Sequence, residues 1–335
     1  MSVLLLSIIV VGGLGLLAAA GLSIASIFLS VEVDPRLKKV EDTLPGINCG
    51  GCGFASCSVY AQAMLEGEDI SLCAPGGEET SKKLADILDR EISEKAKEVA
   101  RVHCNGTEEN CERRLIYNGV ESCRAAYLLT DSTKKCIYGC EGMGDCVDSC
   151  PFDAIYMGPG RIPIVIEDKC TACGNCVEAC PKDLITLQPY DTRTCVACSN
   201  PERARDVKSV CKVGCIACSL CEKRCPTGAI KMENNLPVWN HKKCDNLGVC
   251  AAVCPTNAIH DIREYIPKAA IDPDKCTGSG ECVKACPIRK CITGEEGEVH
   301  KINPDLCCGC GQCVPVCPEK AITMPEDKKI QKKTA

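Results

Sequence analysis

The sequence predicts an α+β protein with one N-terminal transmembrane helix, a small four-cysteine domain and tandem small modules built around cysteines. Three observations predict this fold class. The chain of 335 residues opens with a run free of charge from Val3 to Leu29. It contains 34 Cys but only 3 Phe, 1 Trp and 7 Tyr, so aromatic side chains supply little of its core. Between residues 140 and 318, six groups of closely spaced cysteines end in Cys-Pro.

The composition requires bonds from cysteine to replace the missing core. Disulfides and metal centres both fit a high cysteine content, so the spacing must decide between them. The formal net charge is −6, from 39 basic and 45 acidic residues, and gives no argument for nucleic-acid binding. We therefore expect no nucleic-acid partner.

The N-terminal apolar run (residues 1–30) is roughly 40 Å long as a helix and can span a bilayer. A cleaved secretory signal is the alternative, but no Lys or Arg precedes the run, and it is longer than a usual signal core. The first basic residues after it are Arg36, Lys38 and Lys39, which the positive-inside rule places in the cytoplasm. We expect a single-pass protein of the plasma membrane with its thiols in the reducing cytoplasm.

A small domain is predicted over residues 31–77. It contains the pattern Cys49-x2-Cys52-x4-Cys57-x15-Cys73 in a glycine-rich segment. Glycines let backbone amides approach and hydrogen-bond to cluster sulfurs. Four thiols suit one [4Fe-4S] cluster, and a structural zinc ion is the alternative.

Residues 78–130 are predicted to link this domain to the modules. The segment from Glu78 to Ala100 is rich in Lys, Glu, Ala and Leu and lacks Gly and Pro, which predicts a helix. Three thiols follow, at Cys104, Cys111 and Cys123, with His103 adjacent to the first. These thiols either bind metal or are plain buried thiols, and both interpretations stay open.

Three of the six Cys-Pro groups reproduce the bacterial ferredoxin pattern C-x2-C-x2-C-x3-C-P in full. In that pattern three thiolates hold one [4Fe-4S] cluster, and the fourth, before Pro, reaches the cluster of the paired motif. Zinc motifs do not run three short spacings ending in Cys-Pro. The complete groups are Cys170/Cys173/Cys176/Cys180, Cys215/Cys218/Cys221/Cys225 and Cys307/Cys310/Cys313/Cys317.

The other three groups have a wider gap, in which Met143, Leu247 or Ser279 replaces the expected thiol. These groups are Cys140/Cys146/Cys150, Cys244/Cys250/Cys254 and Cys276/Cys282/Cys286. Cys136 stands just upstream of the first group and completes it. The remaining candidate ligands are Cys195, Cys198 and Cys211 for the second group, and Cys291 near the third. The third group resembles seven-iron ferredoxins, in which a gapped motif holds a [3Fe-4S] cluster and a nearby thiol stays free.

Pairing the groups in chain order gives three two-cluster modules, residues 131–188, 195–262 and 270–326, followed by a basic tail over residues 327–335. Short β-segments between paired groups, such as Ile162 to Ile166 and Val299 to Ile302, fit a duplicated ferredoxin-type module. A small helix is expected at each C-x3-C-P. Clusters, rather than side chains, are expected to fill the middle of each module.

The predicted ligand sets bound the number of clusters at five or more. The complete sets are Cys49/Cys52/Cys57/Cys73, Cys136/Cys140/Cys146 with Cys180, Cys170/Cys173/Cys176 with Cys150, Cys215/Cys218/Cys221 with Cys254, and Cys307/Cys310/Cys313 with Cys286. The incomplete sets are Cys225/Cys244/Cys250 and Cys276/Cys282/Cys317. The cofactors are at least five [4Fe-4S] clusters, with seven or more, or a [3Fe-4S] cluster at Cys276/Cys282/Cys317, left open. We expect no catalytic side chain, and no flavin or NAD site in this chain.

The anchor, the segment LPGINCGGCGFASC with Cys73, and the tandem ferredoxin motifs together resemble the B subunit of the Rnf complex over nearly the whole chain. The segments around Cys104 and from Cys195 to Cys225 are similar to the long form found in anaerobes. The resemblance implies a subunit of an ion-translocating ferredoxin:NAD oxidoreductase, a translocase. Such a subunit accepts electrons from reduced ferredoxin and passes them to other membrane and peripheral subunits, which reduce NAD while moving Na+ or H+ outward.

Two alternatives remain beside this resemblance. A polyferredoxin subunit of a membrane hydrogenase or formate dehydrogenase shares the Cys-Pro motifs but lacks the LPGINCGGCG segment after an anchor. A zinc-rich scaffold without redox work is the alternative from another class. Because fewer than twenty-five residues separate the apolar run from Cys49, we expect electrons to enter at the distal modules and leave through the Cys49 set.

Overall fold

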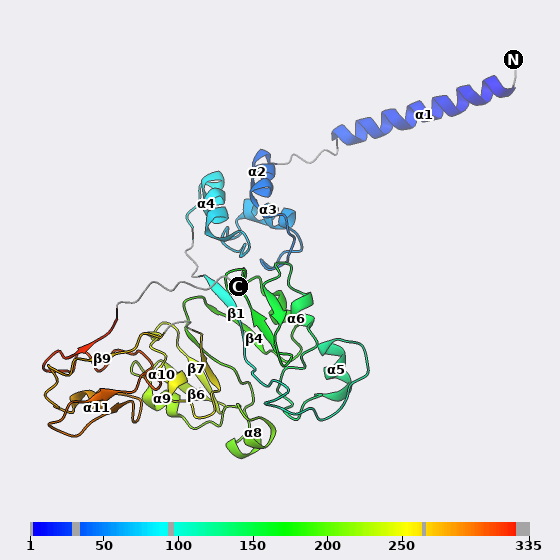
Figure 1. Cartoon of the computed structure of the whole chain (residues 1–335). Coiled ribbons are helices and arrows are strands. Elements are labelled where there is room, and N and C mark those ends of the chain that lie inside the picture. Colours follow the sequence, from blue (N-terminus) through cyan, green and yellow to red (C-terminus); the bar gives the residue numbers. More distant parts are fainter. Residues whose placement is uncertain (1–2, 29–33, 93–96, 263–265, 326–335) are drawn as a thin grey trace.

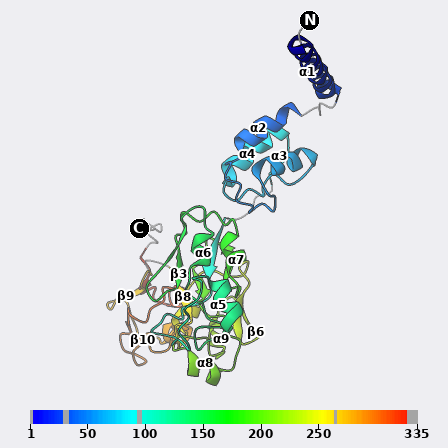
Figure 2. The ribbon, with the colours of Figure 1, turned by 90° about the vertical axis from the view of Figure 1, so that its right-hand side faces the viewer.

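The computed structural model describes residues 3–28, 34–92, 97–262 and 266–325. They form a small helical domain and a larger body of short strands, and helix α1 (Val3–Phe28) extends away from both (Figures 1 and 2). The described side chains of α1 are nearly all exposed. Within the described part of the chain, no helix combines the length and the apolar character needed to cross a membrane.

The helical domain is built from three helices around one core. They are α2 (Pro35–Thr43), α3 (Cys57–Glu66) and α4 (Gly77–Leu88). The side chain of Asp34 accepts a hydrogen bond from the Arg36 amide at the start of α2, and Ser56 caps α3 in the same way. The core contains the buried side chains of Val40, Tyr60, Met64 and Leu84. This domain therefore has a conventional apolar core of its own.

Helix α4 ends at Leu88, so the prediction of a helix from Glu78 to Ala100 is wrong for residues 89–92 and 97–100, and residues 93–96 lie outside the described part of the chain. Asp89 ends the helix in a left-handed conformation with a φ of +53°. Further on, strand β1 (Glu98–Val102) buries Val99 completely. Local propensity favoured a helix, but β1 pairs with a strand more than eighty residues away, and that pairing decides the conformation.

Three modules of one plan make up the larger body. In each module the first strand pairs with the last and the two middle strands pair with each other, all antiparallel. The outer pairs are β1 with β4 (Ile185–Pro189), β5 (Thr194–Val196) with β8 (Ile259–Asp261), and β9 (Ala270–Ile271) with β12 (Ile322–Thr323). The inner pairs are β2 (Ile155–Met157) with β3 (Pro163–Val165), β6 (Ile230–Glu233) with β7 (Leu236–Trp239), and β10 (Ile292–Thr293) with β11 (Lys301–Ile302). The predicted tandem ferredoxin-like modules are thus confirmed.

Strand β1 occupies in the first module the place that β5 and β9 occupy in the others. The isoleucine that follows each outer Cys-Pro pairs with it: Ile185 with Val102, Ile259 with Val196, and Ile322 with Ile271. The first module therefore includes a strand upstream of residue 131, where the sequence placed its start. Residues 103–139, here called the first insertion, and residues 197–214, the second insertion, separate this strand from its ferredoxin motif.

Short helices lie in five of the six Cys-Pro groups. They are α6 (Asp145–Asp148), α7 (Asn175–Ala179), α9 (Leu220–Arg224), α10 (Val249–Ala252) and α11 (Glu281–Ala285). The helix predicted between Cys313 and Cys317 is a series of turns instead. The insertions contribute α5 (Cys123–Thr130) and α8 (Ala204–Val210). Helices of four or five residues are not stable by themselves, so their cysteines and neighbours must fix them.

Replacing Tyr60 by Phe should destabilise the helical domain. The Tyr60 hydroxyl donates to the Asp69 carbonyl oxygen at 2.7 Å and accepts from the Leu72 amide at 3.2 Å, and the residue is 1% exposed. Loss of both hydrogen bonds in this buried place costs about 1–3 kcal/mol and loosens the loop that carries Cys73. The thermal midpoint of the helical domain, measured anaerobically by circular dichroism, should fall.

The matched control for this experiment is Tyr156→Phe, because that side chain is 46% exposed. Its effect should stay within about 0.5 kcal/mol. Equal midpoints for the Tyr60 variant and the control would show that the two hydrogen bonds do not stabilise the domain.

Candidate iron-sulfur sites

The described cysteines are all free thiols, and most of them gather around hollows of similar size. Five such hollows have volumes of about 280, 300, 310, 330 and 380 Å³. Within the described residues, no group of three or more His, Cys, Asp or Glu is arranged to hold a single metal ion. Repeated hollows of similar size, each lined by three or more cysteines, fit a recurring prosthetic group bound through sulfur.

The four cysteines of the helical domain meet at one hollow of about 280 Å³. Cys49, Cys52, Cys57 and Cys73 all line it. The loop before α3 is fixed by Asn48, whose side chain accepts a hydrogen bond from the Cys57 amide at 2.8 Å. Burial raises the pKa of Cys73, and the other three thiols raise it further. Thiols that resist ionisation beside one another are stabilised as thiolates by a metal centre.

The largest hollow, of about 380 Å³, lies in the first module and contains an unexpected thiol. Cys140, Cys146 and Cys180 line it as the sequence predicted, but the fourth cysteine is Cys123. Cys136, which the sequence placed in this set, does not line the hollow. The sequence missed Cys123 because the first insertion folds back over the motif. The sequence signal for the position of Cys123 was that it directly follows Ser122, the residue that caps helix α5.

Asp145 holds Cys123 in this position. Its carboxylate accepts hydrogen bonds from the Cys123 amide at 2.7 Å, the Arg124 amide at 3.1 Å and the Ser122 hydroxyl at 2.9 Å. Burial opposes ionisation of Asp145, but the amide hydrogen bonds outweigh it and lower the pKa of the carboxyl. A carboxylate from α6 thus caps α5, and its negative charge suits a helix N-terminus.

The second predicted set of the first module also comes together. Burial raises the pKa of Cys176 to about 11, and the Cys170, Cys173 and Cys150 thiols raise it further. The Ala100 amide in β1 donates to Cys170 Sγ at 3.5 Å. Strand β1 therefore supplies a hydrogen bond of the kind that tunes cluster sulfurs.

The second module holds one set of four cysteines and a second set of only three. Cys215, Cys218, Cys221 and Cys254 line a hollow of about 310 Å³, as predicted. Cys225 and Cys244 are electrostatic neighbours of Cys250, whose pKa burial raises to about 11. Cys250 also contacts the Thr194 hydroxyl at 3.5 Å.

The three candidates for completing that second set lie elsewhere. Cys195 follows Thr194 in β5 and is therefore on the opposite face of the strand. Burial raises the pKa of Cys195, and its charged neighbours are Arg101 and Glu167 rather than thiols. Cys198 and Cys211 lie in the second insertion, close to Cys104.

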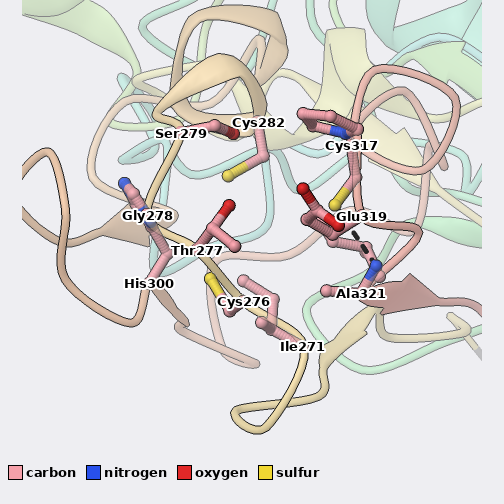
Figure 3. A pocket seen from close by; sticks show the side chains of 12 residues that line it. Ile271, Cys276, Thr277, Gly278, Ser279, Cys282, His300, Cys317, Glu319 and Ala321 are labelled. Atoms are coloured by element: carbon pink, nitrogen blue, oxygen red, sulfur yellow. Dashed lines mark hydrogen bonds between the residues drawn. The ribbon is translucent and has the colours of Figure 1, made fainter.

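The third module holds the last two predicted sets. Cys286, Cys307, Cys310 and Cys313 line a hollow of about 330 Å³ together with Cys291 and Cys308. A second hollow of about 300 Å³ contains three thiols. Figure 3 shows the sulfur atoms of Cys276, Cys282 and Cys317 facing this space, with Ser279 beside Cys282. Cys291 lines the hollow of about 330 Å³, so it does not complete the three-thiol group at the hollow of about 300 Å³.

Five stretches of the chain match known family models of iron-sulfur type. Residues 44–75 match the model described as "Putative Fe-S cluster". Residues 269–324 match a 4Fe-4S dicluster domain, and a second model of that description matches residues 135–184, 214–258 and 243–290. The hollows and these matches define the class: the chain is a protein of several [4Fe-4S] clusters carried in tandem ferredoxin-like modules.

Relatives give the particular family. The chain is 44% identical over 259 residues to the B subunit of the ion-translocating oxidoreductase complex of Methanosarcina acetivorans, covering 77% of this chain and 98% of the relative. It is 38% identical over 266 residues to the B subunit of the proton-translocating ferredoxin:NAD(+) oxidoreductase complex of Clostridium ljungdahlii, covering 78% of this chain and 94% of the relative. It is also 38% identical to the B subunit of the Na(+)-translocating ferredoxin:NAD(+) oxidoreductase complex of Acetobacterium woodii, covering 79% of this chain and 80% of the relative. The chain belongs to this family, the B subunits of Rnf-type complexes.

A solved structure shares less with the chain. The formate dehydrogenase, heterodisulfide reductase and formylmethanofuran dehydrogenase complex from Methanospirillum hungatei matches 53% of this chain and 72% of its own. The identity is 23% and the TM-score is 0.26, so this similarity carries no structural argument.

Paired substitutions should show which cysteine completes the set with Cys180. If Cys123 and Cys180 hold one cluster, the double variant Cys123→Ala/Cys180→Ala should lose about four irons, no more than either single variant. Any iron that Cys136→Ala loses by itself should add to the four irons lost by Cys180→Ala in the double variant Cys136→Ala/Cys180→Ala, because Cys136 does not line this hollow. Iron analysis of the anaerobically purified chain measures both, and the reverse pattern would restore Cys136 to this set.

Proposed function

We propose that this chain is the electron-conducting subunit of an ion-translocating ferredoxin:NAD oxidoreductase. It takes electrons from reduced ferredoxin at its distal modules and passes them, cluster by cluster, to the helical domain and then to membrane subunits. The relatives from C. ljungdahlii and A. woodii are equally identical to this chain but are named for protons and for Na+ respectively. Overall similarity therefore does not select the coupling ion.

The observation that carries this proposal is the contact between the helical domain and the first module. A Cβ on Gly51 would lie 2.6 Å from the Cys173 carbonyl oxygen, so only glycine allows the two loops to approach this closely. Burial raises the pKa of Cys173, and the neighbouring Cys49 thiol raises it further. The set of Cys49 and the set of Cys173 are therefore neighbours, as electron transfer between their clusters requires.

Contacts in the larger body extend the same route. Val249, in α10 of the second module, packs in one core with Cys282 and Cys307 of the third module. The three modules and the helical domain thus form a continuous series, with the helical domain between the modules and α1 (Figure 1). Electrons that enter at the second or third module must leave through the set of Cys49.

The proposal assigns α1 as the anchor that fixes this exit cluster at the membrane. Because no helix of the described residues meets the requirements for crossing a membrane, this assignment rests on the sequence. As a helix, the uncharged run from Val3 to Leu29 is roughly 40 Å long, against a hydrocarbon core of about 30 Å. Its sequence contains no charged residue, and large apolar side chains such as Leu14, Leu16 and Leu22 are 63%, 74% and 73% exposed. Exposed leucines in a helix of this length are stable when lipid or other membrane helices cover them. Arg36, Lys38 and Lys39, which follow α1, support a cytoplasmic position for the clusters.

The proposed ligand sets follow the hollows, and the set of Cys170 follows the grouping of Cys150, Cys170 and Cys173 around Cys176. In each of the sets of Cys49, Cys123, Cys170, Cys215 and Cys307, four thiols together hold one [4Fe-4S] cluster. The hollow of Cys276, Cys282 and Cys317 has Ser279 where a fourth thiol would stand, and three thiols suit a [3Fe-4S] cluster. Each bound cluster supplies one-electron redox chemistry, and the chain's amides and buried surroundings set its potential.

Two variants next to the exit cluster test this function. Cys52→Ala should leave reduction of the other clusters by ferredoxin intact but abolish NAD reduction by membranes that contain the complex. Gly51→Ala should keep the full iron content and yet slow NAD reduction, because its Cβ pushes the helical domain away from Cys173. Stopped-flow spectroscopy and NADH formation measure the two steps.

The two variants fail in distinguishable ways. Unchanged NAD reduction in Cys52→Ala would remove the exit role of this cluster. Unchanged NAD reduction in Gly51→Ala would show that electrons do not cross the contact with Cys173. If ferredoxin fails to reduce the unaltered chain, the proposed donor is wrong.

A further inference from the structure

Eight of the 34 thiols remain outside the ligand sets described above, and the two insertions bring four of them together. Cys104, Cys111 and Cys136 belong to the first insertion, and Cys211 belongs to the second. The equivalent segment of the third module is only residues 272–275 and contains no cysteine. The first two modules therefore share cysteine-containing insertions that the third module lacks.

Backbone hydrogen bonds align three of these cysteines. The Lys135 amide donates to the Glu112 carbonyl oxygen at 2.9 Å, which places the next residue, Cys136, beside Cys111. On the other side, the Lys212 amide donates to the Asn110 carbonyl oxygen at 2.9 Å. Since Cys211 precedes Lys212 and Cys111 follows Asn110, this hydrogen bond brings Cys211 close to Cys111. Cys111 thus lies between Cys136 and Cys211.

Gly106 brings the fourth thiol to the group. A Cβ at this glycine would lie 3.4 Å from Cys104 Sγ and 3.4 Å from the Cβ of Cys111, so both cysteines line the same small space. Burial raises the pKa of Cys136 to about 12, with Cys111 and Cys104 adding to it. Burial raises the pKa of Cys211 to about 11, and the same two thiols are its first electrostatic neighbours.

The surroundings of this group suit a buried anion. Cys104 Sγ accepts hydrogen bonds from the Gly106 amide at 3.4 Å and the Cys140 amide at 3.3 Å, and Cys136 Sγ accepts one from the Asn200 side chain at 3.6 Å. Lys134 is completely buried, with its ammonium on the Gly106 carbonyl oxygen. A buried cation and several N–H donors stabilise negative charge on sulfur.

His103 is not part of the group, although it precedes Cys104. Its Nδ1 pairs with the Val196 carbonyl oxygen at 2.8 Å, and its Nε2 pairs with the Thr186 hydroxyl at 2.7 Å. Both ring nitrogens are thus engaged away from the thiols. The group consists of sulfur alone, which favours an iron-sulfur cluster over a mixed histidine site.

We propose that Cys104, Cys111, Cys136 and Cys211 hold a further [4Fe-4S] cluster, built by the two insertions between the first and second modules. The cubane is preferred over a single zinc ion because the described thiols lie in no single-ion arrangement. This inference extends the proposed electron-conducting function but depends only on metal content.

The position of the cluster makes it a relay between the two modules. On one side, the Cys140 amide that donates to Cys104 belongs to a residue lining the hollow of Cys123 and Cys180. On the other side, Cys198 is buried between Cys104 and Cys254, a ligand of the second module. Each transfer moves one electron: the donor cluster of the second module is oxidised, the relay is reduced, and the relay then reduces the cluster of the first module.

The variant Cys111→Ala tests this site in the full-length chain. Iron and acid-labile sulfide should each fall by about four per chain after anaerobic purification. Cys211→Ala should lose the same amount, and the double variant should lose no more than either single one. The matched control is Cys195→Ala, which removes a thiol that is 8% exposed and has Arg101 and Glu167 as neighbours. Its iron content should not change.

Three results would overturn the proposal. Iron content unchanged in both single variants would show that these thiols hold no cluster. Loss of one zinc with iron unchanged would make the site a zinc site. A loss of about eight irons in the double variant would place Cys111 and Cys211 at different clusters. Because Cys211 is less buried than Cys111, its variant gives the result even if Cys111→Ala does not fold. Ferredoxin and NAD are absent from these measurements, so their outcome is independent of the proposed function.

Discussion

Bonds from cysteine sulfur to iron are the interaction on which the larger body of this protein depends. Its strands are two to five residues long, and its motif helices have four or five residues. In the second module, one core consists of Ile230 and Ile259 with Cys221 and Cys250, so half of its buried residues are thiols. Elements of this size bury too little apolar surface to fold by themselves. Clusters that bind four distant residues each supply what the side chains lack. The helical domain, with Tyr60, Met64 and Leu84 in its core, differs in this respect.

The duplicated plan explains how one chain becomes an electron conductor. The fourth cysteine of a motif lies with the thiols of its partner motif, and under the proposed ligand sets this arrangement fixes the separation of the clusters within a module. The modules are then joined by local devices: the contact of Gly51 with Cys173, the packing of Val249 against the third module, and the paired insertions between the first two modules. The first device brings Cys49 near Cys173, and the third brings Cys111 near Cys136 and Cys211. The chain is therefore a series of cluster sites whose order in space follows their function.

Sequence spacing predicted the local sites well and the long-range ones less well. The sets of Cys49 and Cys215 follow from their spacing because most of their ligands lie within a few residues of one another. Cys123, rather than Cys136, lines the hollow with Cys180, because the positions of both depend on how the first insertion folds, through Asp145 and through the pairing of Lys135 with Glu112. Strand β1 was mistaken for helix because its partner is distant in the chain. The predicted β-segments from Ile162 to Ile166 and from Val299 to Ile302, by contrast, contain strands β3 and β11, because their partner strands lie close in the chain.

Amide hydrogen exchange before and after anaerobic removal of iron tests the central claim most directly. If clusters replace the apolar core, chelation should bring the amides of the module strands close to unprotected exchange, while amides of α2, α3 and α4 that pack on Val40, Tyr60 and Leu84 keep part of their protection. Modules that stay protected without iron would contradict the account, because their side chains would then be sufficient to hold the fold.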